Sequence, residues 1–193
     1  MKLFKLVIST AGALELLTSA MAQNIVSPSG TEIDRFLDSS GMKMVVVNGH
    51  KMAVSRALRQ GQLTKASADC FRSDEVVATY IEQVLRPLIA KNVNNPEDLK
   101  AANSFNETTT GIKIARYIKS AQNAALDSFD RGENLPPLTP MQLSQQEKEE
   151  VGRWEASSHF VAIRQFEAVL RNMRATQEYQ LWLASNRAKC SEK

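Results

Sequence analysis

The sequence predicts an all-α protein, a small helical bundle of about five to seven helices. Apolar residues recur at intervals of three and four along most of the 193-residue chain, which is the spacing of one helix face. Capping residues precede several of these stretches. No stretch shows the sustained alternation of apolar and polar residues that is typical of a strand.

The first 22 residues have the organisation of a secretory signal peptide. Two lysines precede an apolar stretch at 6–17, and Ala20 and Ala22 form a small-residue cleavage site before Gln23. The stretch contains a glutamate and is shorter than the roughly 20 apolar residues that span a bilayer. We expect cleavage that leaves no integral membrane segment, and a mature protein in the periplasm of a Gram-negative bacterium or secreted. The alternative is an uncleaved amphipathic N-terminus.

The mature chain is predicted to be a flexible leader, residues 23–31, followed by a single helical domain over residues 32–190. The leader contains proline, glycine and serine without periodicity. The remaining length suits one hydrophobic core. The net charge of the whole chain is only +3, and basic residues are interspersed with acidic ones instead of forming a patch. This balance predicts no nucleic-acid partner.

The first half of the domain is predicted to contain two helical regions. Thr31 is expected to cap the first, which Gly41 weakens and divides, and His50 is expected to serve a helix end. A polar stretch follows at 60–69. Ser73 is predicted to cap the clearest helix of the chain, which Pro87 should kink or end. Its candidate core residues are Val77, Tyr80, Ile81, Val84, Leu85 and Leu88.

The second half of the domain opens on a dense helix-start signal, Asn95-Pro96-Glu97-Asp98. This helix should run to about Thr108, and a further amphipathic helix should follow a break at Gly111. Three prolines within 132–140 predict a connector. Ser144 and Glu147 then form a capping box, and the helical pattern continues to about residue 189.

An internal repeat relates these two helix starts. A shift of 49 residues aligns Asn95 with Ser144, Phe105 with Trp154, and the apolar positions that follow. Each copy, about 95–131 and 144–180, is predicted to be a helical hairpin with hydroxyl residues at its break. Two such hairpins can complete a core that neither buries alone. Coincidence between two amphipathic segments is the alternative.

These residues also resemble a known family. The segments LRPLIAKNVNNPEDLKAANSFNETTTGIKIARYI and LSQQEKEEVGRWEASSHFVAIRQF are similar to bacterial envelope proteins of the DUF2059 type, over about residues 74–170. The shared features are an acidic helix start, an aromatic residue, small residues, a glycine and an apolar-basic helix. Thr109 stands where the family usually has proline. The resemblance implies a small, helical, mostly exported protein of unassigned biochemistry, and it supplies no catalytic residues.

Cys70 and Cys190 are the only cysteines of the chain. In an oxidising compartment an even pair is usually bonded, so we expect a disulfide that closes a loop of about 120 residues. Two unpaired thiols, or pairing of Cys190 between chains, are the alternatives.

The sequence predicts no catalytic centre, no cofactor and no metal site. The only histidines are His50 and His159, and no nucleophile motif surrounds His159 beside Ser157 and Ser158. Two distant histidines do not make a zinc site, and no glycine-rich phosphate loop is present. A peptidoglycan-active enzyme is the alternative that is hardest to exclude, because such enzymes can use one buried glutamate or a pair of carboxylates. Its candidate acids are Glu97, Glu107 and Glu155.

The leading functional hypothesis is therefore a non-catalytic binding module of the cell envelope, with an envelope protein or peptide as its partner. A periplasmic inhibitor or immunity protein against a toxin is one alternative within this class. Helix ends leave backbone groups free, so the hairpin breaks are the predicted binding surface. Its candidate residues are Thr108, Thr109, Gly111, Ser157, Ser158 and His159.

Overall fold

The computed structural model of the protein describes residues 28–191. The predicted signal peptide and most of the predicted leader lie outside this range. Within it the structure is all-α and has no strand. Its α-helical segments are α1 (Gly30–Ser39), α2 (Met42–Arg59), α3 (Lys65–Arg72), α4 (Asp74–Tyr80), α5 (Arg86–Asn92), α6 (Pro96–Asn106), α7 (Thr109–Asp130), α8 (Gln145–Glu155), α9 (Ser158–Arg171) and α10 (Gln177–Ser191).

The described residues contain more helices than the five to seven expected. A π-helical turn, η1 (Ile81–Leu85), joins α4 to α5 in one continuous helix, which leaves nine helices in this range. A 3₁₀ turn, η2 (Met173–Ala175), separates α9 from α10. The extra helices come from short segments, such as α3 within the polar stretch, whose ends are set by local caps.

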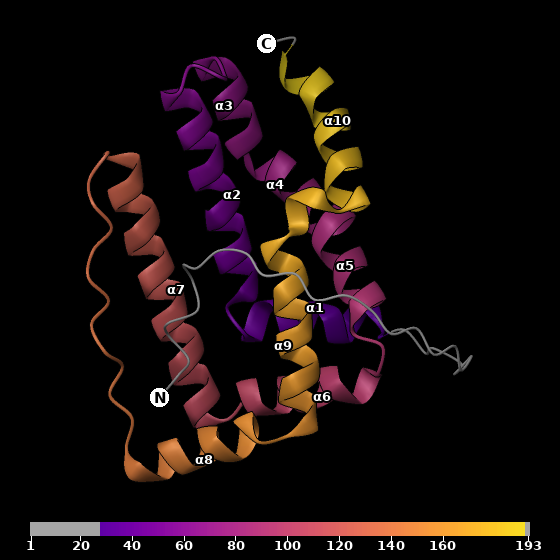
Figure 1. Ribbon diagram of the computed structural model, residues 1–193, viewed down its shortest axis with the longest axis vertical. Helices are drawn as coiled ribbons and strands as arrows, with labels where there is room; N and C mark the ends of the chain where they lie inside the picture. The colour runs from indigo at the N-terminus through magenta and orange to yellow at the C-terminus, as the bar shows by residue number, and fades with distance from the viewer. Residues whose placement is uncertain (1–27, 192–193) are drawn as a thin grey trace.

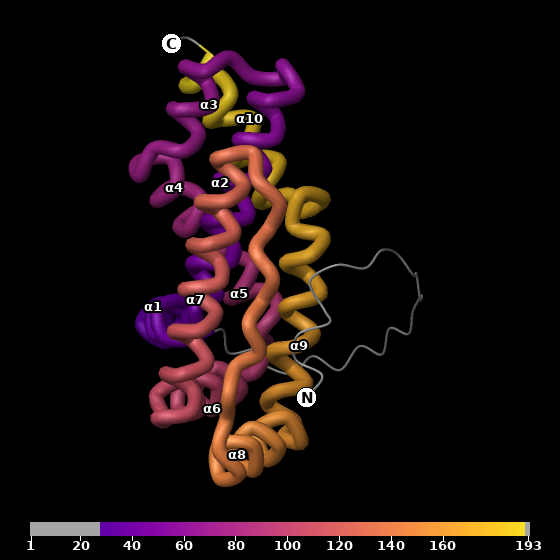
Figure 2. Tube along the Cα trace, turned by 90° about the vertical axis from the view of Figure 1, so that its left-hand side faces the viewer, coloured from indigo at the N-terminus to yellow at the C-terminus, as the bar shows by residue number. Residues whose placement is uncertain are grey.

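The helices are arranged between two ends of an elongated body (Figure 1). The short helices α6 and α8 lie across one end, while α3 and α10 meet at the other end, beside the C-terminus. The long helices α2 and α7 pack side by side, and α9 packs against α6 and leads back toward α10. The view in Figure 2 shows the extended chain between α7 and α8 running along the outside of α7.

The beginning of the domain differs from expectation in two places. Helix α1 begins at Gly30, inside the predicted leader, because the Ser29 hydroxyl and not that of Thr31 accepts from a backbone amide, that of Glu32, at 3.2 Å. Gly41 divides α1 from α2 as predicted, with a φ of 78°. His50, however, is not at a helix end. It lies inside α2, where its buried ring donates from Nε2 to the Phe71 carbonyl oxygen at 3.0 Å.

The continuous helix from Asp74 to Asn92 is the centre of the core. The predicted core residues are buried, except Ile81, which is half-buried. Pro87 neither ends this helix nor interrupts the core. It follows directly on the π-helical turn, whose wider winding relieves the clash between a proline ring and the preceding turn.

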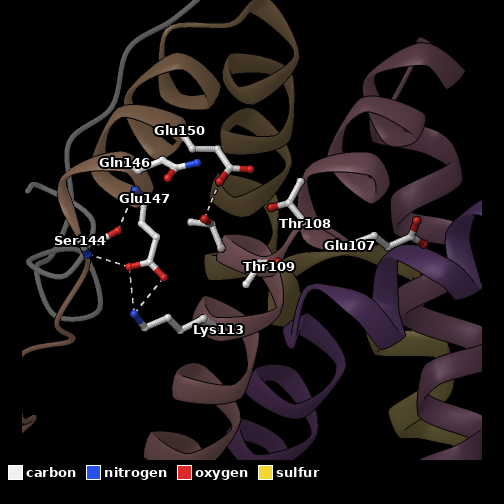
Figure 3. Close-up of a pocket in the computed structure, with 9 residues that line it drawn as sticks. Glu107, Thr108, Thr109, Lys113, Ser144, Gln146, Glu147 and Glu150 are labelled. Atoms are coloured by element: carbon white, nitrogen blue, oxygen red, sulfur yellow. Dashed lines mark hydrogen bonds and ion pairs between the residues drawn. The ribbon is translucent and has the colours of Figure 1, made fainter.

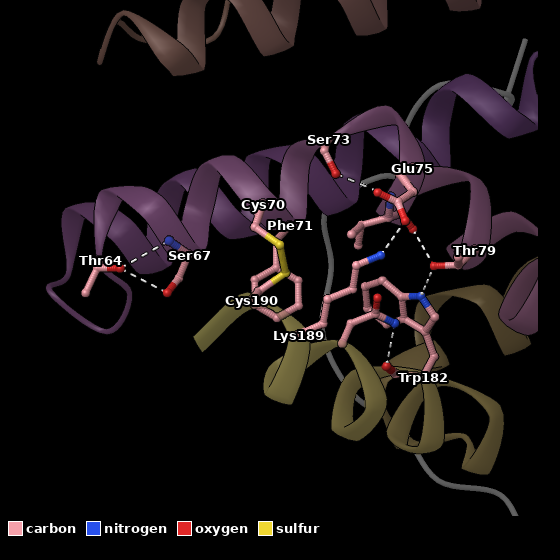
Figure 4. Close-up of a disulfide and its surroundings, with 12 residues drawn as sticks. Thr64, Ser67, Cys70, Phe71, Ser73, Glu75, Thr79, Trp182, Lys189 and Cys190 are labelled. Atoms are coloured by element: carbon pink, nitrogen blue, oxygen red, sulfur yellow. Dashed lines mark hydrogen bonds and ion pairs between the residues drawn. A yellow bond between two sulfur atoms is a disulfide. The ribbon is translucent and has the colours of Figure 1, made fainter. Parts of the chain in front are cut away.

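The C-terminal helix α10 is fastened to this centre by an aromatic contact and a covalent bond (Figure 4). Trp182 is 1% exposed, and its Nε1 donates to the Thr79 hydroxyl at 3.0 Å. Its ring lies 4.9 Å from the Tyr80 ring. Further along α10, Cys190 is bonded to Cys70 of α3, and the two Cα atoms are 5.6 Å apart. The predicted intramolecular disulfide is therefore present.

Helix α7 is held to α2 and α3 largely by polar contacts. Asp130 accepts from Arg72 Nη2 at 2.5 Å and from the Ser55 hydroxyl at 2.9 Å. Asn48 donates to the Asn123 side chain at 3.2 Å, and the Arg59 guanidinium stacks over the Phe129 ring. The predicted apolar face of α7 is consequently only half-buried.

In the part of the chain that the structure describes, no helix has the length and apolar character needed to cross a membrane.

Loss of the disulfide should destabilise the fold. The bond joins residues 120 positions apart, so removing it restores conformational entropy to the unfolded chain worth about 4 to 5 kcal/mol. We expect Cys70→Ser/Cys190→Ser to lose roughly this free energy of unfolding in urea titrations under non-reducing conditions. The variant should be insensitive to dithiothreitol. A loss under about 1 kcal/mol contradicts the expectation.

The Asp130 contact should make stability depend on pH. The hydrogen bond from Arg72 holds the pKa of Asp130 below its usual value of 3.8. A depressed folded pKa gives stability that is complete above the unfolded pKa and is lost as pH falls through the folded value. Asp130→Asn should therefore cost about 1 to 2 kcal/mol at pH 7, and the cost should shrink below the unfolded pKa. The exposed neighbour Asp127 provides a control. Asp127→Asn should have the same free energy of unfolding as the parent, both at pH 7 and below the unfolded pKa of Asp130. An equal cost of Asp130→Asn at both pH values contradicts the assignment.

Candidate functional site

The two predicted hairpins have the same local structure at their bases. Helices α6 and α8 begin and end 49 residues apart, and α7 and α9 begin at the same offset. Thr108 Oγ1 accepts from the amide of Gly111 at 3.1 Å, and Ser157 Oγ accepts from the amide of Phe160 at 3.1 Å. The hydroxyl residues at the two breaks are therefore helix caps.

The hairpins differ in the length of their second arm. Helix α7 continues to Asp130, whereas α9 ends at Arg171 and is followed by η2. The second repeat unit, predicted to extend to about residue 180, therefore contains a turn and the beginning of α10. The correspondence holds for the short helices, the breaks and the first turns of the long helices.

The short helices meet through equivalent aromatic residues. The rings of Phe105 in α6 and Trp154 in α8 are stacked, with centroids 5.1 Å apart and planes at 10°. Around this stack each break contacts the other hairpin: His159 Nδ1 lies 2.7 Å from Asp98 Oδ1, and the Thr110 hydroxyl, at the equivalent position, donates to Glu150. Each break thus contacts the short helix of the other hairpin, although the two acids, Asp98 and Glu150, are not at equivalent repeat positions.

One side of this junction forms an open depression of about 850 Å³ (Figure 3). It lies between the break of the first hairpin and the first turns of α8. We call it the hairpin depression. Its lining residues are Glu107, Thr108, Thr109, Thr110, Lys113, Ser144, Gln146, Glu147 and Glu150.

Charge in the hairpin depression is unevenly neutralised. Lys113 Nζ lies 2.9 Å from both carboxylate oxygens of Glu147, which also accepts from the Ser144 amide. These bonds hold the pKa of Glu147 below its usual range. Glu107 points away from these groups (Figure 3) and forms a bidentate pair with Arg35 of α1. Glu150 accepts from the Thr110 hydroxyl, and no cation of the described residues is paired with it. The depression therefore carries a net negative charge around Glu150.

The predicted binding residues are divided between two places. Thr108 and Thr109 line the hairpin depression. Ser157, Ser158 and His159 belong to the second break, outside the depression, where His159 pairs with Asp98. Sequence periodicity indicated two similar breaks, but the side on which each lies depends on the packing of the hairpins about the aromatic stack.

Gly111 is a packing residue and has no exposed surface to offer a ligand. It is buried in the first turn of α7, against the C-terminal end of α6. A Cβ atom at this position would lie 2.1 Å from the Phe105 carbonyl oxygen. Only glycine permits this close approach of the two helices.

Seven lining residues of the depression were not singled out from the sequence as binding residues: Glu107, Thr110, Lys113, Ser144, Gln146, Glu147 and Glu150. Glu147 was identified only as part of the capping box, a role that the structure confirms. The signal for Glu150 is its place one helical turn after Glu147 on the same face of α8. Its proximity to Thr110 is a tertiary contact that this spacing does not reveal.

Two candidate acids of the enzymatic alternative, Glu97 and Glu107, are held in ion pairs. Glu97 pairs with Lys100 at 2.7 Å. The hydrogen bond from Arg35 lowers the pKa of Glu107, which is opposite to the shift that a general acid needs. In the described part of the chain, no three or more histidine, cysteine, aspartate or glutamate residues are grouped as metal ligands.

The close approach at Gly111 leads to a paired prediction. Gly111→Ala should cost about 3 kcal/mol, because the backbone of α6 has to move. Gly152 is also a helical glycine, in α8, but a Cβ atom there meets nothing within 4 Å. Gly152→Ala should instead stabilise the protein by about 0.5 to 1 kcal/mol. Urea unfolding of both variants measures the difference, and equal effects contradict the packing role.

No protein-family model matches the chain, and comparison with curated proteins and with solved structures finds no match.

Proposed function

We propose that this protein is an exported binding module of the bacterial cell envelope that acts without catalysis. In this proposal its hairpin depression contacts a cationic segment of an envelope protein or peptide. The observation that carries the proposal is the uncompensated carboxylate of Glu150 in an open depression between two helix starts.

Export is supported by two independent features. The N-terminal 22 residues have the pattern of a signal peptide. The Cys70–Cys190 bond is of the kind that persists in oxidising compartments and is rare in the cytosol. The resemblance of residues 74–170 to DUF2059-type envelope proteins agrees with this location, and we propose membership of that family on the same residues.

Binding is supported by the shape and charge of the hairpin depression. The site is open to solvent, so a macromolecular segment can enter it without displacing other parts of the fold. A lysine or arginine side chain placed beside Glu150 would form a charge-assisted hydrogen bond to the carboxylate. Because Lys113 is paired with Glu147, Glu150 is the main attraction for a cation in the depression.

Three polar groups of the depression have structural roles that account for their presence. Ser144 caps α8, Thr108 caps α7, and Lys113 is held in an ion pair. A serine or threonine nucleophile needs an adjacent general base. The hydroxyls of Thr108 and Ser144 bond to backbone groups, as those of capping residues do, and this supports binding over catalysis at these two positions.

Substitution of Glu150 should weaken partner capture. Mature protein beginning at Gln23 would be immobilised and used to recover proteins from envelope extract. We expect a specific partner whose recovery falls at least about tenfold with Glu150→Lys, since attraction becomes repulsion. Glu150→Gln, which keeps an acceptor for Thr110, should give a smaller loss. Recovery should also fall as salt rises from 50 to 500 mM.

The matched control is Glu149→Lys. Glu149 is the exposed neighbour on α8, contacts Gln145 and does not line the depression. This variant should capture the partner like the parent protein. Equal capture by the Glu150 and Glu149 variants contradicts the site, and no partner at any salt concentration contradicts the module. Turnover of purified sacculi that is abolished by Glu97→Gln, Glu107→Gln or Glu155→Gln would instead establish the enzyme. An identified partner that is a toxin would assign the inhibitor role.

A further inference from the structure

The chain between α7 and α8 has features that the hairpin depression does not explain. Residues 133–143 form an extended segment that runs beside α7 (Figures 1 and 2). We call this segment the strap. It contains three prolines, and two of its leucines are among the most exposed apolar side chains of the described residues, Leu135 at 54% and Leu138 at 52%.

The sequence of the strap favours an extended, polyproline II backbone over residues 135–140. Proline fixes its own φ near −65°, and the residue before a proline is excluded from the helical region. Within residues 135–140, φ is fixed at the three prolines, Pro136, Pro137 and Pro140. The helical region is disfavoured at Leu135 and Thr139, because each precedes a proline. Only Leu138 is unrestricted. Residues 135–140 are therefore biased toward the polyproline II conformation.

A polyproline II helix has three residues per turn and so presents three ridges. The strap contacts α7 through Pro136, which is half-buried, and through the Thr139 carbonyl oxygen, which accepts from the Tyr117 hydroxyl at 2.6 Å, while the Thr139 side chain is exposed. The ridge of Leu135 and Leu138 and the ridge of Pro137 and Pro140 are exposed.

The path of the strap explains its extension but not its exposed ridges. Helix α7 has 22 residues and is about 33 Å long. The eleven residues 133–143 cover about 34 Å as polyproline II, which is the distance required to return to the base. This return needs an extended chain, but it does not need two leucines facing solvent. Half-buried Met141 and Leu143 already attach the lower end.

We propose that the strap is a preformed ligand for a partner domain with an aromatic-lined groove of the kind that binds polyproline II segments. Such grooves accept two adjacent ridges of the ligand and hydrogen-bond to its carbonyl groups. Both ends of the strap are held by helices, so little conformational entropy is lost on binding. Residues 134–143 contain no charged residue, and recognition therefore depends on apolar contact.

The absence of charge over residues 134–143 distinguishes this part of the strap, which begins at Glu133, from the hairpin depression. Binding at Glu150 weakens with salt, whereas binding at the strap is nearly independent of salt. The inference does not rest on the proposed function, and either site can fail without the other.

The test uses the disulfide-bonded mature protein and three isolated ¹⁵N-labelled domains as probes: an SH3 domain, a WW domain and an EVH1 domain. We expect saturable chemical-shift changes confined to the aromatic groove of at least one probe. Leu138→Asp should weaken that binding at least about tenfold, because a carboxylate enters an apolar contact. Pro137→Ala/Pro140→Ala should weaken it also, since the preformed helix is lost.

Leu181→Asp is the matched control. Leu181 of α10 is 63% exposed, so the same substitution there leaves the strap intact and should bind the probe like the parent. Circular dichroism of each variant reports whether the fold is retained. The proposal is overturned if the folded parent perturbs no groove at 1 mM of any probe, or if the Leu138 and Leu181 variants bind equally well.

Discussion

The docking of Trp182 on the central helix is the contact on which the rest of the architecture depends. Its indole lies against Tyr80, donates to Thr79 and is edge-on to buried His50. Burial lowers the pKa of His50 and raises that of Tyr80, so both groups are neutral at physiological pH and suit an apolar core. Because α10 is fastened here and by the disulfide, α9 has to return from the base across α6.

This constraint separates two hairpins of similar local sequence. Phe166 of α9 is 1% exposed and joins the core, together with Ile163. The residue at the equivalent position of α7 is Tyr117, whose hydroxyl holds the strap through Thr139. Helix α7 contributes mainly small and polar buried residues to its contact with α2. One hairpin therefore closes the core, and the other presents a surface.

The features that could be predicted from the sequence are those set by neighbouring residues. The caps at Ser73, Asn95 and Ser144 lie where the sequence indicated, because a capping side chain contacts amides two or three positions away. The errors arose where tertiary contacts override local preference. Pro87 continues the helix after a π-helical turn, and His50 lies inside α2, where its Nε2 donates to the Phe71 carbonyl oxygen. The place of Glu150 beside Thr110 likewise depends on hairpin packing.

The strap and the hairpin depression are continuous in the chain. Residues 133–143 end directly at Ser144, which caps α8 and lines the depression. Tyr117 fixes the strap from α7, the same helix that brings Thr110 to Glu150. A partner that engages both surfaces would combine an apolar contact of low entropic cost with an ionic contact at Glu150. Salt would then alter the rate of its encounter with the protein more than the apolar contact that retains it.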